Sequence, residues 1–529
     1  MRRRPAARAA AGAAGAHGKE ESMHSYRRAG AAGRPTLYLA LLAGLIAGGA
    51  FAQGSCPPGD VDLIRSPCTG CVPLDDLGPG FYQGFQGGLY PGGANVPPPA
   101  HHAAAVALAQ QIEPLDRQGD PDPDGLIGLI AVSMSNGSQE FAVFERREDL
   151  NGARNPQVVI TDTAQGGKSA DVIKDPNDNY WTLVRDRLQA AGVSPLQVQA
   201  AWIKGADDMP CCNNVFPDHA INLRDELRQI VQILKNRFPN LRLAFLSSRI
   251  YGGYSARAER SEPLSYETGF AAKWLIEDQI NGDPSLNYDP DDALPDRAPL
   301  LLWGPYLWAD GPSPSLQGRL WCRGDLEDDA VHPGPGAEAK VGNLLSAFFA
   351  ADDATLPWFA APGGTQLVAL DATDDAFVDA DSGDANFGDS PLLWVTPPTD
   401  PWLAGERDVY LRFDASGVSG TLLHAKLSLR VHTANAGGGD VFRAASHAWS
   451  EDVITWNNAP GIDAAHLLAP VPPVSRDNTF SARVTPAVDA ALGGPIAFAV
   501  TTAQGTGVRL MRSKEDAEPP RLILTLRQP

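Results

Sequence analysis

The stretch LIGLIAVSMSNGSQEF, residues 126–141, sets the architecture of the first part of this chain. Residues 126–132 form a continuous apolar run, which predicts a short strand buried on both faces of a parallel sheet. The small polar residues that follow predict a turn. Because ligands collect beyond the carboxyl ends of strands in open α/β sheets, Ser135 is a candidate nucleophile. A turn that merely caps the next helix explains the same residues.

Strands and helices alternate along the rest of this part. Further apolar runs predict strands at residues 157–161, 198–203, 241–246 and 300–303. Apolar residues at helical spacing predict helices at residues 179–191, 222–238, 266–280 and 337–350. Such alternation predicts a parallel sheet with helices on both faces.

The pattern changes after residue 350. Short alternating or apolar segments now predict an antiparallel β-sandwich, with strands at residues 409–413, 425–431, 496–501, 508–511 and 521–526. A chain of 529 residues is long enough for two such cores. The expected organisation is an α/β domain at residues 53–350 with a Pro- and Gly-rich N-terminal extension, a linker at 351–367 and a sandwich at 368–529.

The first 52 residues have the features of a signal peptide region. Three arginines, at positions 27, 28 and 34, precede the apolar run 37–46, and small residues at 48–52 resemble a cleavage region. We therefore expect a secreted protein, with a periplasmic location as the alternative. No later segment is long and apolar enough to span a membrane. The net charge of −20 disfavours nucleic acid as a partner.

All six cysteines would meet an oxidising compartment after export, which predicts disulfides. Their pairing cannot be read from the sequence, although a link from Cys211 or Cys212 to Cys322 is attractive. Cys68 and Cys71 have the spacing of half a metal site, but no second such pair or histidine pair accompanies them. No metal site is expected.

An acid and a histidine lie three residues apart just before the last predicted helix of the α/β part. On a turn, this spacing lets Asp329 and His332 project to the same side, so that the acid orients the imidazole. An ordinary helix N-terminus rich in acids explains the segment equally well.

Other strand ends carry small or polar residues. Gly166 and Gly167 follow one predicted strand, where a glycine amide can approach a substrate oxygen, and Asp207 follows another. Because these turns share one edge of the sheet, they favour a functional site over separate structural roles. Arg249 and Tyr251 follow a fourth strand and could line a substrate cleft, although an aromatic residue there also fits simple packing.

The order of these motifs resembles the SGNH (GDSL-type) hydrolase superfamily. More narrowly, residues 72–350 look like an uncharacterised secreted bacterial branch of it. The matching segments are SMSNGSQEF, AQGGKSA, SSRIYGGY, YETGFAAKWLIEDQ and DDAVHPG. The resemblance implies a three-layer, flavodoxin-like α/β fold and a serine hydrolase without a cofactor. It assigns Ser135 as nucleophile and Asp329 and His332 as acid and base. The oxyanion donors are the amides of Ser135 and Gly167, with Gly166 as the second choice for the glycine.

Two motifs depart from the family pattern. The usual G-D-S is Ser133-Met134-Ser135 here, which leaves Ser133 as a second choice for the nucleophile. Asp207 stands where the G-x-N-D motif has asparagine, and an ionised carboxylate repels an oxyanion. Loss of one oxyanion donor costs on the order of 10²–10³ in rate. Unless Asp207 is protonated or another group substitutes, the domain is a weak enzyme or a non-catalytic descendant.

The C-terminal part resembles the DNRLRE-type jelly-roll module, related to carbohydrate-binding modules, over residues 368–528. The segments that carry the resemblance include TDDAFV, NFG, DVYLRFD, AKLSL and WSEDVITWN. Trp449 and Trp456 could stack on sugar rings, and buried packing tryptophans are an equal alternative. Asp374, Asp375 and Asp414 form no compact loop of oxygen ligands for calcium.

Together these features predict a secreted serine esterase that acts on ester substituents of a polysaccharide and carries a carbohydrate-binding module. The alternative is a secreted glycan-binding or adhesion protein whose hydrolase domain has degenerated. Asp207 favours the alternative, whereas Ser135 with Asp329 and His332 favours the enzyme. The expected partner is a polysaccharide or glycan ester, with no cofactor, no nucleic acid and no membrane span once the signal is removed.

Overall fold

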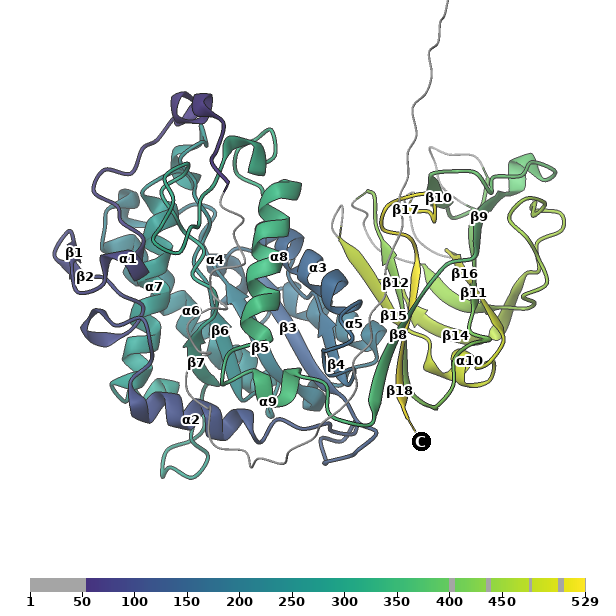
Figure 1. The fold of residues 1–529 in the computed structure, drawn as a ribbon, viewed down its shortest axis with the longest axis horizontal. Helices are drawn as coiled ribbons and strands as arrows, with labels where there is room; N and C mark the ends of the chain where they lie inside the picture. The colour runs from purple at the N-terminus through teal and green to yellow at the C-terminus, as the bar shows by residue number, and fades with distance from the viewer. Residues whose placement is uncertain (1–53, 399–404, 434–438, 475–477, 503–508, 529) are drawn as a thin grey trace, which may run out of the picture. The chain divides into compact units, whose positions relative to one another are not determined.

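Five parallel strands form the central sheet of the α/β part in the computed structural model (Figure 1). They are β3 (Ile127–Ser133), β4 (Val158–Thr161), β5 (Val198–Lys204), β6 (Leu243–Leu246) and β7 (Leu300–Trp303). Every residue in them is buried, as expected for apolar strands covered on both faces. Their spatial order is β4-β3-β5-β6-β7, or 2-1-3-4-5 in chain order, a doubly wound order whose ligands bind where the order reverses.

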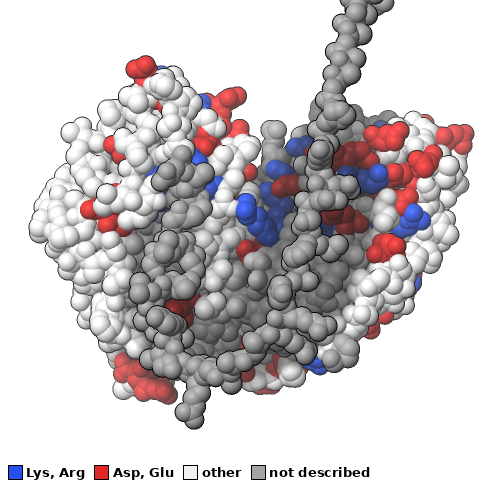
Figure 2. Space-filling view, in the orientation of Figure 1, with Lys and Arg blue, Asp and Glu red and all other residues white. Residues whose placement is uncertain are grey.

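The structure describes residues 54–398, 405–433, 439–474, 478–502 and 509–528. The predicted signal region lies outside these ranges. Among the described helices, none has both the length and the apolar character needed to cross a membrane. Asp and Glu side chains are spread over the face shown in Figure 2, as the acidic composition implies.

Helices cover the sheet. The longer ones are α3 (Ser135–Glu148), α5 (Tyr180–Ala191), α6 (Asp218–Arg237), α7 (Leu264–Ile280) and α8 (Pro335–Phe349). Helix α3 packs against α8, and α6 packs against α7 (Figure 1). Glycine allows a close approach in the first pair, since a Cβ atom at Gly342 would lie 2.8 Å from Val143 Cγ1. The α/β class predicted from alternating patterns is therefore confirmed.

One local prediction differs from the structure. The small polar residues after β3 were expected to make a turn, but they form the first turn of α3, which begins at Ser135 itself. Side chains of that turn are held by distant parts of the chain: Asn136 donates to the Val331 carbonyl and Ser138 donates to Asp162. These tertiary contacts compensate for the low helix propensity of serine, asparagine and glycine.

The described C-terminal part contains three antiparallel sheets. The two larger ones have the orders β14-β13-β16-β11-β9 and β15-β12-β18-β8, and the third is the pair β10-β17. Apolar side chains of both larger sheets, including Leu411, Leu427 and Phe498, form a common core. The predicted β-sandwich is therefore present. Its strands are β8 (Thr365–Asp371), β9 (Asp374–Asp379), β10 (Leu392–Val395), β11 (Arg407–Asp414), β12 (Thr421–Arg430), β13 (Asp440–Ala444), β14 (Ile462–Pro470), β15 (Thr479–Arg483), β16 (Pro495–Thr501), β17 (Arg509–Arg512) and β18 (Arg521–Arg527).

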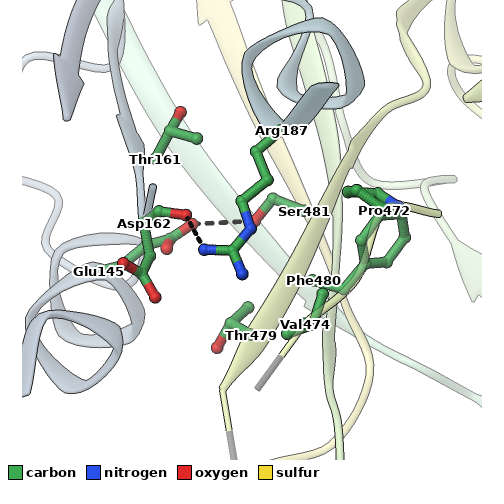
Figure 3. Close-up of a pocket in the computed structure, with 9 residues that line it drawn as sticks. All are labelled: Glu145, Thr161, Asp162, Arg187, Pro472, Val474, Thr479, Phe480 and Ser481. Atoms are coloured by element: carbon green, nitrogen blue, oxygen red, sulfur yellow. Dashed lines mark hydrogen bonds between the residues drawn. The ribbon is translucent and has the colours of Figure 1, made fainter. Parts of the chain in front are cut away.

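Buried polar groups of α3, of α5 and of Asp162, which follows β4, meet residues of the C-terminal part within one compact unit. Arg187 of α5 donates to the Asp162 carbonyl at 3.0 Å (Figure 3). It also donates to the Pro473 carbonyl at 3.0 Å. Lys426 of β12 forms ion pairs with Glu145 at 3.1 Å and with Asp149 at 2.7 Å. Because Lys426 is buried, it needs these acids of the α/β part as partners, whereas Arg187 has acceptors in both parts of the chain.

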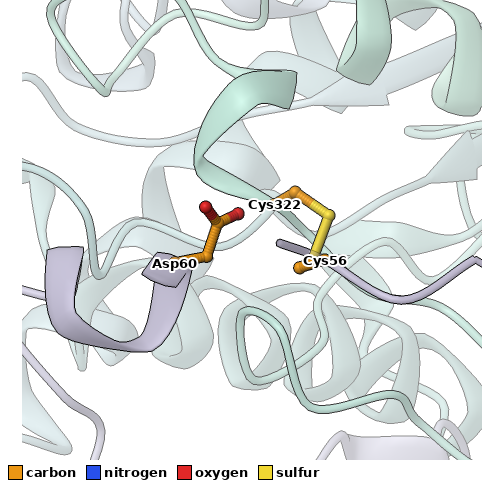
Figure 4. A group of neighbouring side chains, drawn as sticks. All are labelled: Cys56, Asp60 and Cys322. Carbon is orange, nitrogen blue, oxygen red and sulfur yellow. A yellow bond between two sulfur atoms is a disulfide. The ribbon is translucent and has the colours of Figure 1, made fainter. Parts of the chain in front are cut away.

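Three disulfides join the six cysteines: Cys56–Cys322, Cys68–Cys71 and Cys211–Cys212. The suggested link from Cys211 or Cys212 to Cys322 is wrong. The N-terminal segment of the α/β part brings Asp60 beside Cys322 (Figure 4). Asp60 accepts a hydrogen bond from the Arg323 amide at 2.8 Å. That segment therefore brings Cys56, far away in sequence, to Cys322.

Candidate functional site

Ser135, His332 and Asp329 form one hydrogen-bonded row. Ser135 Oγ lies 2.9 Å from His332 Nε2, and His332 Nδ1 lies 2.6 Å from Asp329 Oδ2. Ser135 is the first residue of α3, and the acid and histidine lie in the loop that precedes α8. The structure thus brings together three residues from opposite ends of the α/β part in the geometry of a nucleophile, a base and a group that orients the base.

The turn that carries His332 is closed by its own acid. Asp329 Oδ1 accepts the amides of Val331 at 2.9 Å and His332 at 3.0 Å, while Ala330 adopts a left-handed conformation with φ of 55°. Partial burial acts to raise the pKa of Asp329, but these amide bonds and the imidazole outweigh it and lower the pKa to about 2. The ionised carboxylate is an acceptor for Nδ1–H, which leaves Nε2 to face Ser135.

Two further residues anchor this turn to α3, and sequence reasoning did not identify them. Asn136 Nδ2 donates to the Val331 carbonyl at 2.8 Å, and Gln139 Nε2 donates to the Pro333 carbonyl at 3.2 Å. Gln139 lies four residues after Ser135, on the same helix face. A helical interpretation of the SNGSQ segment would have pointed to it.

Ser133, the second choice for the nucleophile, is buried at the end of β3 and is not among the residues that line the cavity described below. Its hydroxyl donates to the Lys204 carbonyl at 2.7 Å. Ser133 also packs against α3, because a Cβ atom at Gly137 would lie 2.0 Å from its Oγ. The hydroxyl therefore serves the contact between β3, β5 and α3.

Amide donors lie next to Ser135. No side chain caps the start of α3, and the first amides of a helix have no partner within it. The positive end of the helix dipole also favours negative charge there. Gly167 lines the cavity with φ of 74°, a left-handed conformation that glycine adopts readily, whereas Gly166 lies outside the lining. The arrangement suits an oxyanion held by the Ser135 and Gly167 amides.

A cavity of about 210 Å³ opens at this edge of the sheet. It is bounded by the segments that follow β3, β4, β5 and β6 and by the histidine turn. Its lining residues are Met134, Ser135, Asn136, Gly167, Ser169, Asp207, Asp208, Arg249, Arg260, Val331 and His332. Arg249 is therefore in the cavity wall. Tyr251 is not, since it is buried against Tyr254, with the ring centroids 5.3 Å apart.

Asp207 is a buried carboxyl beside a second one. Its Oδ1 and Oε2 of Glu226 are both buried without a hydrogen-bond partner, whereas Glu226 Oε1 accepts Lys174 Nζ at 2.7 Å and Asn222 Nδ2 at 3.0 Å. Burial, and next the Glu226 carboxyl, raise the pKa of Asp207 to about 9; Asp171 adds to the effect. A proton held by the pair keeps Asp207 neutral at pH 7, which removes its repulsion of an oxyanion.

The Cys56–Cys322 disulfide holds the segment that leads into the histidine turn. Replacing both cysteines with serine is expected to lower the free energy of unfolding by about 2–5 kcal/mol, because this bond closes a very long loop in the unfolded chain. Urea denaturation measures the change. The same replacement at Cys68 and Cys71, which close a three-residue separation, should cost clearly less; equal losses would contradict the argument.

The tryptophans of the sandwich differ in exposure. Trp449 is only 9% exposed and packs near Tyr410, with the ring centroids 6.1 Å apart. Trp456 is half-buried beside the same small cluster. Trp449 thus contributes mainly to packing, whereas Trp456 keeps a partly accessible ring.

The three acids considered for calcium have protein partners. Asp374 pairs with Arg412, Asp375 accepts the Lys514 amide at 2.7 Å, and Asp414 accepts the Ser416 amide at 2.9 Å. In the described part of the chain, the three do not come together as a group of neighbouring metal ligands.

Comparison with known proteins concerns the C-terminal part. Residues 366–526 match the model of carbohydrate-binding module family 96, a range that takes in nearly the whole sandwich from β8 to β18. No curated protein matches the chain. The family match indicates that the C-terminal part of this protein is a carbohydrate-binding module.

Proposed function

We propose that this protein is an exported serine esterase of the SGNH type, which removes ester substituents from a polysaccharide held by its C-terminal module. The observation that carries the proposal is the row Ser135–His332–Asp329 at the wall of a cavity, at the carboxyl edge of a parallel sheet. The 2-1-3-4-5 strand order supports the family assignment. The disulfides and the carbohydrate-binding module are compatible with an extracellular location.

The geometry supports a two-step reaction. Ser135 Oγ attacks the ester carbonyl while His332 Nε2 takes its proton, and Asp329 stabilises the imidazolium. The oxyanion accepts hydrogen bonds from the Ser135 and Gly167 amides. His332 then protonates the departing sugar oxygen. Water, deprotonated by the same imidazole, attacks the acyl-enzyme and releases the carboxylic acid, which regenerates Ser135.

The test is release of acid from esterified polysaccharides. Purified full-length protein is incubated with acetylated xylan, with acetylated pectin and with short acyl esters, and free acetate or the corresponding acid is measured. We expect acid to be released without cleavage of the polymer backbone. Binding to the polysaccharides with no acid released from any ester would instead favour a glycan-binding protein with a degenerate hydrolase domain. An ionised Asp207 would be consistent with that alternative.

Asp207 gives the esterase a predicted alkaline limit. Below its raised pKa the carboxyl is neutral; as the pH rises through about 9 it ionises and repels the oxyanion. We expect kcat/KM to fall roughly tenfold or more from about pH 7 to about pH 10. The Asp207→Asn variant carries no ionisable group at this position, so its profile should stay flat over that range. A wild-type profile that stays flat, or an identical fall in the variant, would refute the role of Asp207.

A further inference from the structure

Arg249 is a buried cation in the cavity wall that lacks a direct partner. Only 7% of the residue is exposed, and it lines the same cavity as Ser135 and His332. Its guanidinium forms no hydrogen bond and no ion pair with any residue that the structure describes; only its backbone amide is used, as a donor to Thr268 Oγ1 at 3.1 Å. The other arginine of the cavity, Arg260, is paired with Asp208.

The acids that act on Arg249 electrostatically already have other partners. They are Glu262, Glu140 and Asp208. Glu140 is ion-paired with Lys204, and Asp208 with Arg260. Glu262 accepts hydrogen bonds from the Gly252 amide, the Tyr266 amide and the Trp308 indole, and burial raises its pKa to about 7.

The raised pKa of Asp207 also keeps that carboxyl neutral. Burial of a guanidinium without hydrogen bonds is unfavourable, so Arg249 is available to an anion that enters the cavity.

The position of Arg249 separates this anion from the reacting ester. Arg249 follows β6, which lies two strands away from β3, the strand that leads to Ser135. Neighbouring strands are about 4.8 Å apart, so the two segments leave the sheet roughly 10 Å from each other. The anion therefore belongs to a substituent beside the ester. A planar guanidinium matches a carboxylate in bidentate geometry.

We propose that Arg249 forms a subsite for a sugar carboxylate, so that the substrate is an esterified polysaccharide containing uronic acid. This rests on the proposed esterase function for the identity of the ester, but the subsite itself binds without turnover. The chain as a whole is strongly acidic and repels polyanions at long range. A single buried cation in the cavity therefore provides local selection for the carboxylate.

Calorimetry on the full-length Ser135→Ala protein tests the subsite, because the ligand stays intact in the absence of the nucleophile. The two probes are acetylated tetragalacturonate and the same oligosaccharide with its carboxylates methyl-esterified. We expect the charged probe to bind about 10–100-fold more tightly, the range for a charge-assisted hydrogen bond. Arg249→Met in this background should abolish the preference. Arg249→Lys keeps the positive charge but loses the bidentate geometry of the guanidinium, so it should retain part of the preference for the charged probe.

Arg257→Met is the matched control, since Arg257 is exposed and lies outside the cavity lining. It should leave the preference unchanged. Arg249→Met is expected to melt at a temperature at or above that of its parent, because it removes an unpaired buried charge, so its effect on binding would not reflect misfolding.

Equal affinity for the two probes would overturn the proposal. So would a preference that persists in Arg249→Met, which would place carboxylate recognition in the C-terminal module. These outcomes are independent of the proposed reaction. Hydrolysis of neutral and charged esters at the same kcat/KM refutes the subsite alone, whereas a carboxylate preference that depends on Arg249 without hydrolysis by the wild-type protein refutes the esterase alone.

Discussion

Replacing Ser135 with alanine is expected to lower kcat for ester hydrolysis by about 10⁴-fold or more, because it removes the hydroxyl that is hydrogen-bonded to His332. The hydroxyl lies 2.9 Å from His332 Nε2 and in the wall of the cavity. The change removes only the half-buried Ser135 Oγ atom. It leaves the hydrogen bonds of Asn136 and Gln139 to the histidine turn in place. Stability should therefore hardly change, and the loss should appear in kcat with little change in KM. Initial rates of acid release measure both constants.

Ser133→Ala is the matched control. This serine lies two residues earlier, and its hydroxyl is directed to the Lys204 carbonyl. Losing that bond costs about 1 kcal/mol of stability and should leave the reaction largely intact. If Ser133→Ala abolished turnover and Ser135→Ala did not, the assignment of the nucleophile would be reversed. If neither variant lost activity, the hydrolysis would arise from another site.

Lys204→Met is expected to lower the free energy of unfolding by about 3–5 kcal/mol, the cost of leaving a buried charge without its partner. Lys204, the last residue of β5, forms an ion pair with Glu140 of α3, and both side chains are almost fully buried. Burial raises the pKa of Glu140 and lowers the pKa of Lys204, and their mutual attraction opposes both shifts. Equilibrium denaturation in urea gives the change.

The double variant Lys204→Met with Glu140→Leu separates loss of the pair from loss of volume. With both charges removed, most of the stability should return, because an apolar pair avoids the desolvation penalty of two ions. A double variant as unstable as Lys204→Met would show that packing, and not the unpaired carboxylate, causes the loss. Lys204 accepts a hydrogen bond from the Ser133 hydroxyl through its carbonyl and pairs with Glu140 of α3, so the single variant should also reduce activity by disturbing the start of α3.

Local sequence was sufficient for the class of each half of this protein. Buried strands such as β3 and β5 are continuous apolar runs, and their alternation with amphipathic helices predicts a parallel sheet without any long-range information. Strands such as β8 and β14 were not predicted. The apolar run of β8, residues 367–370, is short and begins inside the expected linker, and Asp463 and His466 interrupt the apolar residues of β14. Ser135 was a candidate because it follows a buried strand, and Asp329 and His332 were candidates because of their spacing. The family resemblance assigned their roles, which remain a prediction until the variants are assayed.

Contacts between residues far apart in sequence were decided only by the tertiary structure. Cys56 reaches Cys322 because a whole segment runs beside it, and no spacing along the chain encodes that path. Asp207 differs from an ordinary aspartate because folding buries it beside Glu226. Arg249 is notable only because the acids around it already have other partners. Periodicity is a property of neighbours along the chain, whereas pairing, burial and charge balance depend on neighbours in space, which the sequence does not reveal until it is folded.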